Sequence, residues 1–376
     1  MDIKKLYTPI IKELNLGGIC AKTVLSGETA PVIIKATITS LNDIFPTLME
    51  QLLNITIGSS EINYINNLLI LIKPDNTAYI YKHFPLGIKV RLKKGLTNGS
   101  IIYNDDIADI ESIFFEDAIF KFNYVKGDKV ICLLRENWKF VLHIDLTCKS
   151  NKEDVYFDIG NAYKLLKYYD LYNFLENHDN FDMLINDGWF PFLELMSSTY
   201  KDLLNYYNDK ENYLSNIDFI LNKYTSQKLN ILIQKWWSNP IFSDKKEIIQ
   251  AGIDSYCSNT KSGYINCIKN LSTELEGIIR ITYTKKNHKT PQTKDLKNFI
   301  YTVSKSKFSS DASLAFPLLF KKYLDNVIFK GFDIIHNNVP PSRHSFAHGV
   351  ASSEQYSKIK AFQLILCLDQ LYYYLL

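Results

Sequence analysis

The sequence lacks a strong net charge and lacks long apolar runs. Its 43 basic and 40 acidic residues leave a formal charge of +3. That balance excludes a histone-like polycation but not a local basic cleft, because net charge says nothing about clustering. The longest apolar runs, such as 68–72, are far shorter than the roughly 20 residues of a membrane span. Residues 1–16 mix charged with apolar residues, unlike a signal peptide. We therefore expect a cytoplasmic protein without a membrane partner.

Cysteine pairs with close spacing are also missing. None of the six cysteines forms a C-x-x-C pair, and several lie within apolar segments. This pattern predicts reduced, buried thiols in a cytosolic protein. The composition is otherwise ordinary, with 46% apolar and 22% charged residues, which argues against wholesale disorder. A length of 376 residues allows two or three domains at roughly 150 residues each.

Residues 1–150 predict an α+β domain with a mainly antiparallel sheet. Apolar residues alternate with a period of two, and the turn 74–76 between two such runs indicates a hairpin. Neither a P-loop nor a G-x-G-x-x-G motif occurs here, so no motif in this half indicates a ligand. The expected strands are 32–38, 68–73, 77–84, 88–92, 119–124, 129–134 and 138–146, with a short helix near 44–53.

The polar segment 148–154 is the expected domain boundary, and helical spacing dominates beyond it. We predict a helical connecting segment over 155–240 and an all-α helical bundle over 241–376. Asp244 and Glu247 resemble a capping box. The expected helices are 162–176, 192–207, 217–237, 244–256, 264–283 and 357–376, with a basic loop over 285–291.

Three of the seven histidines lie within residues 336–348. Prolines at 340 and 341 cannot continue a helix and Ser342 is a good N-cap, so Arg343 is predicted to be the first helical residue. His344 and His348 are four residues apart and therefore neighbours on one helical face. A permanent guanidinium, two imidazoles and the free amides of a helix start together suit a phosphate group.

Spacing alone leaves three interpretations of this segment open: ordinary packing, phosphate chemistry, or a zinc pair, since His-x3-His is also a metal-ligand spacing. A zinc site needs further ligands, and the nearest candidates are His336, Glu354 and Cys367. Residue 345 is Ser, so the glutamate of the H-E-x-x-H metalloprotease motif is missing.

The segment from Arg343 to His348 resembles the R-[polar]-x3-H signature of the HEPN superfamily (higher eukaryotes and prokaryotes nucleotide-binding). Its members are small α-helical bundles, many of them metal-independent ribonucleases. The context is similar too: 263–264 matches a Gly-Tyr helix start, 275–279 an E-G-I-hydrophobic helix end, and 348–349 an H-G pair before a long apolar helix. The resemblance covers about residues 242–376 and leaves the N-terminal half uncovered.

The resemblance implies a role for each motif residue. Arg343 would bind and stabilise the scissile phosphate, His348 would be the acid/base histidine, and His344 would assist or orient. Supporting roles fall to Ser342 and Ser345 in the same turn. Glu276 would orient Arg343 or a histidine across the bundle, or else be a plain surface charge.

The resemblance also implies an activity. RNA would be cleaved by attack of its own 2′-hydroxyl, leaving a 2′,3′-cyclic phosphate, with no metal or cofactor. Family members commonly dimerise and place two motifs across one cleft, so we expect a homodimer.

The expected setting is a toxin or anti-phage effector, with a cognate antitoxin or a phage-derived trigger as partner and residues 1–150 as a sensor or regulatory domain. Toxins of this superfamily that are silenced by a partner nucleotidyltransferase often carry Tyr two residues after the signature His, whereas residue 350 is Val here. The alternative is a non-catalytic HEPN scaffold that binds RNA, a nucleotide or a protein.

Overall fold

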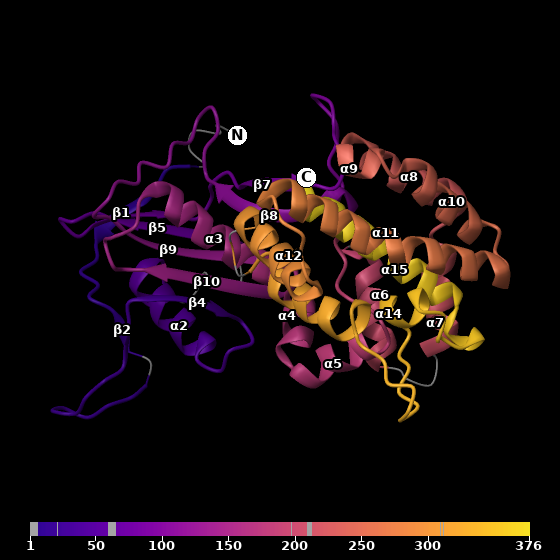
Figure 1. Cartoon of the computed structure of the whole chain (residues 1–376). Helices are drawn as coiled ribbons and strands as arrows, with labels where there is room; N and C mark the ends of the chain where they lie inside the picture. Colours follow the sequence, from indigo (N-terminus) through magenta and orange to yellow (C-terminus); the bar gives the residue numbers. More distant parts are fainter. Residues whose placement is uncertain are drawn as a thin grey trace. The chain divides into compact units, whose positions relative to one another are not determined.

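A computed structural model of the chain consists of two compact units (Figure 1). Unit 1 comprises residues 1–91 and 110–170, and unit 2 comprises residues 92–109 and 171–376. Strands with one helix form an antiparallel sheet in the N-terminal region, and the region after residue 150 is all helical, which confirms the predicted fold class. The residues that the structure describes are 7–20, 22–58, 65–196, 198–208, 213–308, 310 and 312–376.

Unit 1 is built on a six-stranded sheet in the order β1-β6-β5-β9-β10-β4, with every neighbouring pair antiparallel. The predicted hairpin is β5–β6, and its turn uses Asp75, which accepts a hydrogen bond from the Thr77 amide at 2.9 Å. Asn76 has a left-handed φ of 66°, which its residue type tolerates. The strands of this sheet are β1 (Ile10–Glu13), β4 (Lys35–Thr39), β5 (Leu68–Ile72), β6 (Thr77–Tyr81), β9 (Lys129–Glu136) and β10 (Lys139–Asp145).

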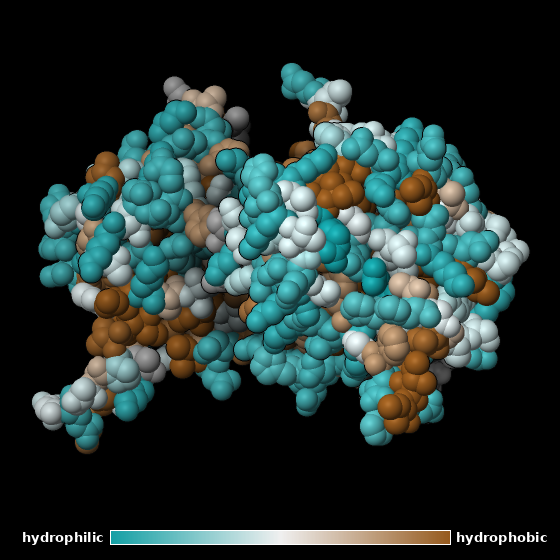
Figure 2. All heavy atoms as spheres, viewed as in Figure 1, coloured by the Kyte–Doolittle hydropathy of each residue, from teal (hydrophilic) through white to brown (hydrophobic). Residues whose placement is uncertain are grey.

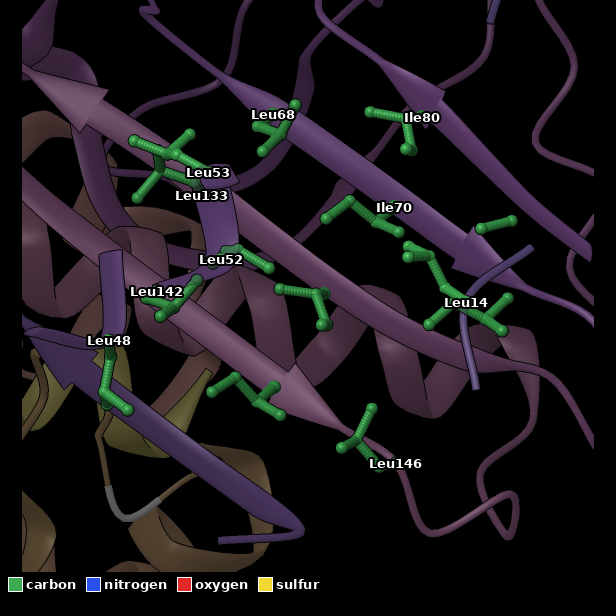
Figure 3. Close-up of a cluster of buried hydrophobic side chains, with 14 of the residues drawn as sticks. Leu14, Leu48, Leu52, Leu53, Leu68, Ile70, Ile80, Leu133, Leu142 and Leu146 are labelled. Carbon is green, nitrogen blue, oxygen red and sulfur yellow. The ribbon is translucent and has the colours of Figure 1, made fainter. Parts of the chain in front are cut away.

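One face of this sheet carries the apolar core of unit 1. Helix α2 (Phe45–Thr56) lays Leu48, Leu52 and Leu53 against strand residues such as Ile70 (Figure 3). Alternate residues of each strand reach this face because side chains alternate with a period of two. Two further pairs of strands, β2 (Ile19–Cys20) with β3 (Val32–Ile33) and β7 (Gly87–Leu92) with β8 (Ile107–Phe114), form separate small sheets.

The predicted boundary at 148–154 is instead the start of a helix of unit 1. Asn151 caps α3 (Lys152–Lys167), and its side chain accepts from the Asp154 amide. Helix α3 packs on β9 and β10, and a Cβ at Gly160 would lie 2.7 Å from Ser112 Cα, so only glycine permits this approach. The predicted connecting segment 155–240 is thereby divided between the two units.

The strand predicted at 119–124 is wrong. Phe120, Phe122 and Tyr124 are buried, as alternation suggests, but the backbone joins no sheet. Phe122 packs edge-on against Phe115 with ring centroids 5.5 Å apart. The period of two therefore reports burial of alternate side chains, which does not require a paired strand.

Unit 2 is organised around the C-terminal helix α15 (Lys358–Leu375), of which only the first two and the last residue are not buried. Helices α10 and α11 pack along each other, and α11 and α12 both contact α15. The other helical elements are α4 (Tyr169–Glu176), which crosses the unit boundary, α5 (His178–Asn186), η3 (Leu193–Leu195), α6 (Ser198–Asn208), α7 (Tyr213–Asn222), α8 (Ser226–Gln234), η5 (Lys235–Ser238), α9 (Pro240–Ser243), α10 (Lys246–Cys257), α11 (Lys261–Asn287), α12 (Thr293–Lys307), α13 (Pro317–Tyr323), η6 (Leu324–Ile328), α14 (Arg343–Ala347) and η7 (Ser353–Gln355).

Several helix ends differ from the expected ones. The capping box of Asp244 and Glu247 is absent, since α10 begins at residue 246 without a side-chain cap. Helix α11 begins earlier than predicted because Thr260 caps it, and it runs into the expected basic loop. The predicted helix 217–237 is broken, since Thr225 starts a new helix by accepting from the Lys228 amide. The predicted helix 192–207 includes residue 197, which lies outside the described residues.

The cysteine prediction is correct in part. All six thiols are free, and Cys132, Cys267 and Cys367 are buried, but Cys20 is exposed on the short strand β2. No helix among the described residues is both long enough and apolar enough to cross a bilayer.

His143 gives unit 1 a pH-dependent stability. It lies on β10, is 2% exposed, and its Nδ1 is 3.1 Å from Thr37 Oγ1. Burial lowers the pKa of His143 to about 4. In the unfolded chain this histidine takes up a proton near pH 6.5, whereas in the folded chain it does not do so until about pH 4. The contribution of the neutral His143 to the unfolding free energy is therefore complete above pH 6.5 and is lost as the pH falls through this window.

We expect unit 1 to lose about 2 kcal/mol of unfolding free energy between about pH 7 and about pH 5. Hydrogen-exchange protection factors of the β9 and β10 amides measure this change, and His143→Gln should flatten it. The exposed His178 is the matched control, and His178→Gln should keep the wild-type dependence. Protection that does not change with pH in the wild type would contradict the assignment.

Candidate active site

The motif segment forms a short turn of helix against α11 in unit 2. Ser342 is the N-cap of α14, as predicted, and its Oγ accepts from the Ser345 amide at 3.4 Å. In turn, the Ser345 Oγ accepts a hydrogen bond from the Ser342 amide at 3.0 Å. The same hydroxyl donates to the Pro340 carbonyl at 2.6 Å. Ser342 also donates to the Lys330 carbonyl at 2.7 Å. Because both serines are buried, they hold the start of α14 in one position.

Arg343 is joined to α11 by an ion pair. Its Nε lies 2.6 Å from Oε2 of Glu276, a carboxylate that is only 8% exposed. The N–H is not aligned on that oxygen, so the contact is an ion pair without a hydrogen bond. Arg280, one turn further along α11, donates to the other oxygen of Glu276 at 2.6 Å. Two guanidiniums around one carboxylate leave this cluster with a net charge of one positive unit.

His344 lies beside Arg343, and its Nδ1 is 3.5 Å from the Arg343 Nη1. A guanidinium can only donate, so Nδ1 is the acceptor and the proton of the neutral ring is on Nε2. Partial burial, and then the charge of Arg343, lower the pKa of His344 below its usual value. The His344 ring packs near Phe329, with centroids 6.2 Å apart. This imidazole is therefore neutral at physiological pH and presents an N–H donor.

His348 ends α14, is exposed, and has its ring 5.7 Å from that of Phe332. One helical turn separates it from His344, and the charge of His348 contributes to lowering the His344 pKa. The structure thus brings Arg343 and His344 together, with Glu276 behind them, and leaves His348 accessible at the surface next to them.

The described residues place no further zinc ligand beside His344 and His348. His336 Nδ1 is 2.7 Å from the Asp333 carboxylate, and Cys367 is buried on α15. Within the described parts of the chain, no three side chains of the His, Cys, Asp and Glu types lie together as a possible metal site.

Sequence reasoning missed two features next to the motif. Arg280 was not identified, although its spacing of four residues from Glu276 on a helix was the available signal. The hairpin closed by the bridge between Asp333 and Asn338 was also missed, and it exposes Ile334 and Ile335. Its hydrophobic residues have no helical or strand period, so no pattern indicated it.

Searches for related family models, curated proteins and solved structures found no match to this chain.

We expect the His344 ring to titrate below the usual value of about 6.5 in an NMR pH titration. Arg343→Met should raise that pKa, because it removes the adjacent positive charge while Arg280 still neutralises Glu276. Glu276→Gln should lower it further, since the carboxylate favours the protonated ring. A His344 pKa that is the same in all three proteins would show that the cluster does not act on this ring.

Proposed function

We propose that residues 241–376 of unit 2 form a HEPN-type, metal-independent endoribonuclease domain whose catalytic residues are Arg343, His344 and His348. The observation that carries the proposal is the capped start of α14, where a guanidinium and an imidazole meet at 3.5 Å over a buried carboxylate.

Arg343 would bind the scissile phosphate. The Nε edge faces Glu276, and among the described residues the only other polar contact of this guanidinium is with the His344 ring. The remaining N–H groups are therefore available to two phosphate oxygens. The net positive charge of the Arg280–Glu276–Arg343 cluster stabilises the additional negative charge of the pentacoordinate phosphate.

His348 suits the proton transfers. Its exposed imidazole can take the proton of the 2′-hydroxyl as that oxygen attacks phosphorus, and the imidazolium so formed can return a proton to the departing 5′-oxygen. The neutral His344 would assist by donating a hydrogen bond from its Nε2–H to a phosphate oxygen. The P–O bond to the 5′-oxygen breaks as the new bond forms, which yields a 2′,3′-cyclic phosphate and a 5′-hydroxyl.

A homodimer would place two such sites together. Ile334 and Ile335 are 61% and 90% exposed on the hairpin beside α14, and Figure 2 shows an apolar tip where this loop extends in Figure 1. Exposed apolar residues on a projecting hairpin are typical of an interaction surface. We place the second copy of the chain there, so that its motif faces the same RNA.

The proposed setting is a cytoplasmic toxin or anti-phage effector, in which residues 1–150 sense a trigger or bind an antitoxin. RNA is the proposed substrate. The setting, the partner and the substrate are proposed from what is common in the family that the motif resembles.

A non-catalytic scaffold is the second candidate, and one observation favours it. Glu276 already neutralises part of the Arg343 charge, and the described residues place no acceptor on His348 that would orient it for proton transfer. Such a site could hold an RNA phosphate without cleaving it.

We expect the full chain to cleave RNA in excess EDTA, with products that carry a cyclic phosphate. Arg343→Met and His348→Ala should each lower the rate at least about 100-fold, a loss typical of removing one group that stabilises the transition state. The assay follows labelled RNA on gels, with circular dichroism to check the fold. His178→Ala, at an exposed histidine on α5, is the control. Binding of RNA by all variants without cleavage by any would favour the scaffold.

Ile335→Asp should lower the dimer fraction and the cleavage rate together, because a buried carboxylate at the interface lacks a partner. Sedimentation velocity at several concentrations, with the RNA assay on the same samples, measures both. Ile231→Asp is the matched control, since Ile231 is 67% exposed on α8. A monomer with undiminished specific activity would contradict the shared site.

A further inference from the structure

A separate cavity of about 340 Å³ lies within unit 2. Its wall is formed by the end of α5, by η6, by the segment before α14 and by the start of α15. This volume is at the lower end of the roughly 300–1,000 Å³ of small-molecule sites. The cavity is therefore large enough for a compact metabolite and too small for a polynucleotide strand.

Lys360 is the unusual residue of this wall. It is 6% exposed on the first turn of α15, where its amide donates to the Ser357 Oγ at 3.1 Å. No carboxylate or other acceptor among the described residues contacts its ammonium group. Burial lowers the pKa of Lys360 to about 8, so the group still carries most of its charge near neutral pH. The Lys360 Nζ is not among the fully enclosed polar atoms, so the ammonium opens onto the cavity, where an anion would give it the partner that the described residues do not supply.

The rest of the wall restricts the ligand. Lys330 and Lys360 are balanced by Asp187 and Glu354, so the lining is neutral overall and does not favour a polyphosphate. The amide side chains of Asn186 and Asn326 can bond to hydroxyl groups, whereas those of Gln355 and Gln363 already donate to backbone carbonyls. No aromatic side chain is among the lining residues, so the wall offers no surface on which a nucleobase would stack.

We propose that this cavity binds a small molecule with one anionic group, a phosphate or a carboxylate, and several hydroxyl groups, and that Lys360 holds the anion. The wall is completed by Pro340 and Pro341, directly before Ser342 and Arg343. The proposal does not rest on ribonuclease activity, because the cavity and its lysine are distinct from the motif residues.

The test uses thermal unfolding of the full chain with ribose 5-phosphate, gluconate and uncharged ribose. Ribose 5-phosphate represents a phosphate source and gluconate a carboxylate source. We expect one of the two anions to raise the melting temperature by about 5 °C at 100 times its Kd, and ribose to have no effect. Lys360→Met should abolish this shift, and without ligand it should melt no lower than the wild type, because it removes an unpaired buried charge.

Two further variants keep the outcome decisive. Asn326→Trp, at an exposed position of the wall, should block the cavity and abolish the shift even if Lys360→Met folds poorly. Arg343→Met should retain it. The proposal is overturned if neither anion shifts the wild type, if the shift survives Lys360→Met, or if it is lost only in Arg343→Met, which would place the anion at the motif. A shift caused by a short RNA and lost in Lys360→Met would make the cavity part of an RNA path and would also overturn it.

Discussion

The buried carboxylate of Glu276 is the constraint on which the candidate site depends. A carboxylate that is 8% exposed needs a cation, and the chain supplies one from its own helix and one from α14. The second pair fixes the position of α14, which is only five residues long and could not be a stable helix by itself. The serine cap and this ion pair act together: the cap sets where the helix begins, and the ion pair sets which side of it faces α11.

Two buried polar residues of helix α15 have partners within unit 2. Asp369 is paired with Lys235 at 2.8 Å and accepts from the Trp236 indole at 2.7 Å, and Gln370 accepts from the Leu193 amide at 2.9 Å. These contacts join α15 to segments far away in the sequence. Lys360 on the same helix has no such partner among the residues that the structure describes. That contrast within one element is the reason to regard its cavity as a binding site.

The two sites have different chemistry. At the motif, a net positive cluster and two imidazoles lie near the surface, where a flexible phosphodiester can reach them. At the cavity, the buried Lys360 lies in a wall that is neutral overall, which suits a small ligand. The segment 340–342 connects them, because Pro340 and Pro341 line the cavity and Ser342 caps α14.

Local patterns determined much of this protein. The alternation of apolar residues, the hairpin turn at 74–76, the cap at Ser342 and the long apolar C-terminal helix were predictable, because each depends on neighbours within a few residues. The same patterns misplaced the strand at 119–124 and the boundary at 148–154, because tertiary packing overrides local preference at both places. Helix α3 packs on the sheet of unit 1, and the aromatic residues of 119–124 are buried without strand pairing.

The amino-acid sequence by itself determined the fold class and the motif residues that meet at the start of α14. Only the tertiary structure decided that Glu276 reaches Arg343 across 67 residues of chain, that Arg280 shares this carboxylate, and that Lys360, which no described acceptor contacts, borders a cavity. The physical reason is that ion pairing and burial depend on distance in space, which a sequence pattern with a period of two or 3.6 does not contain.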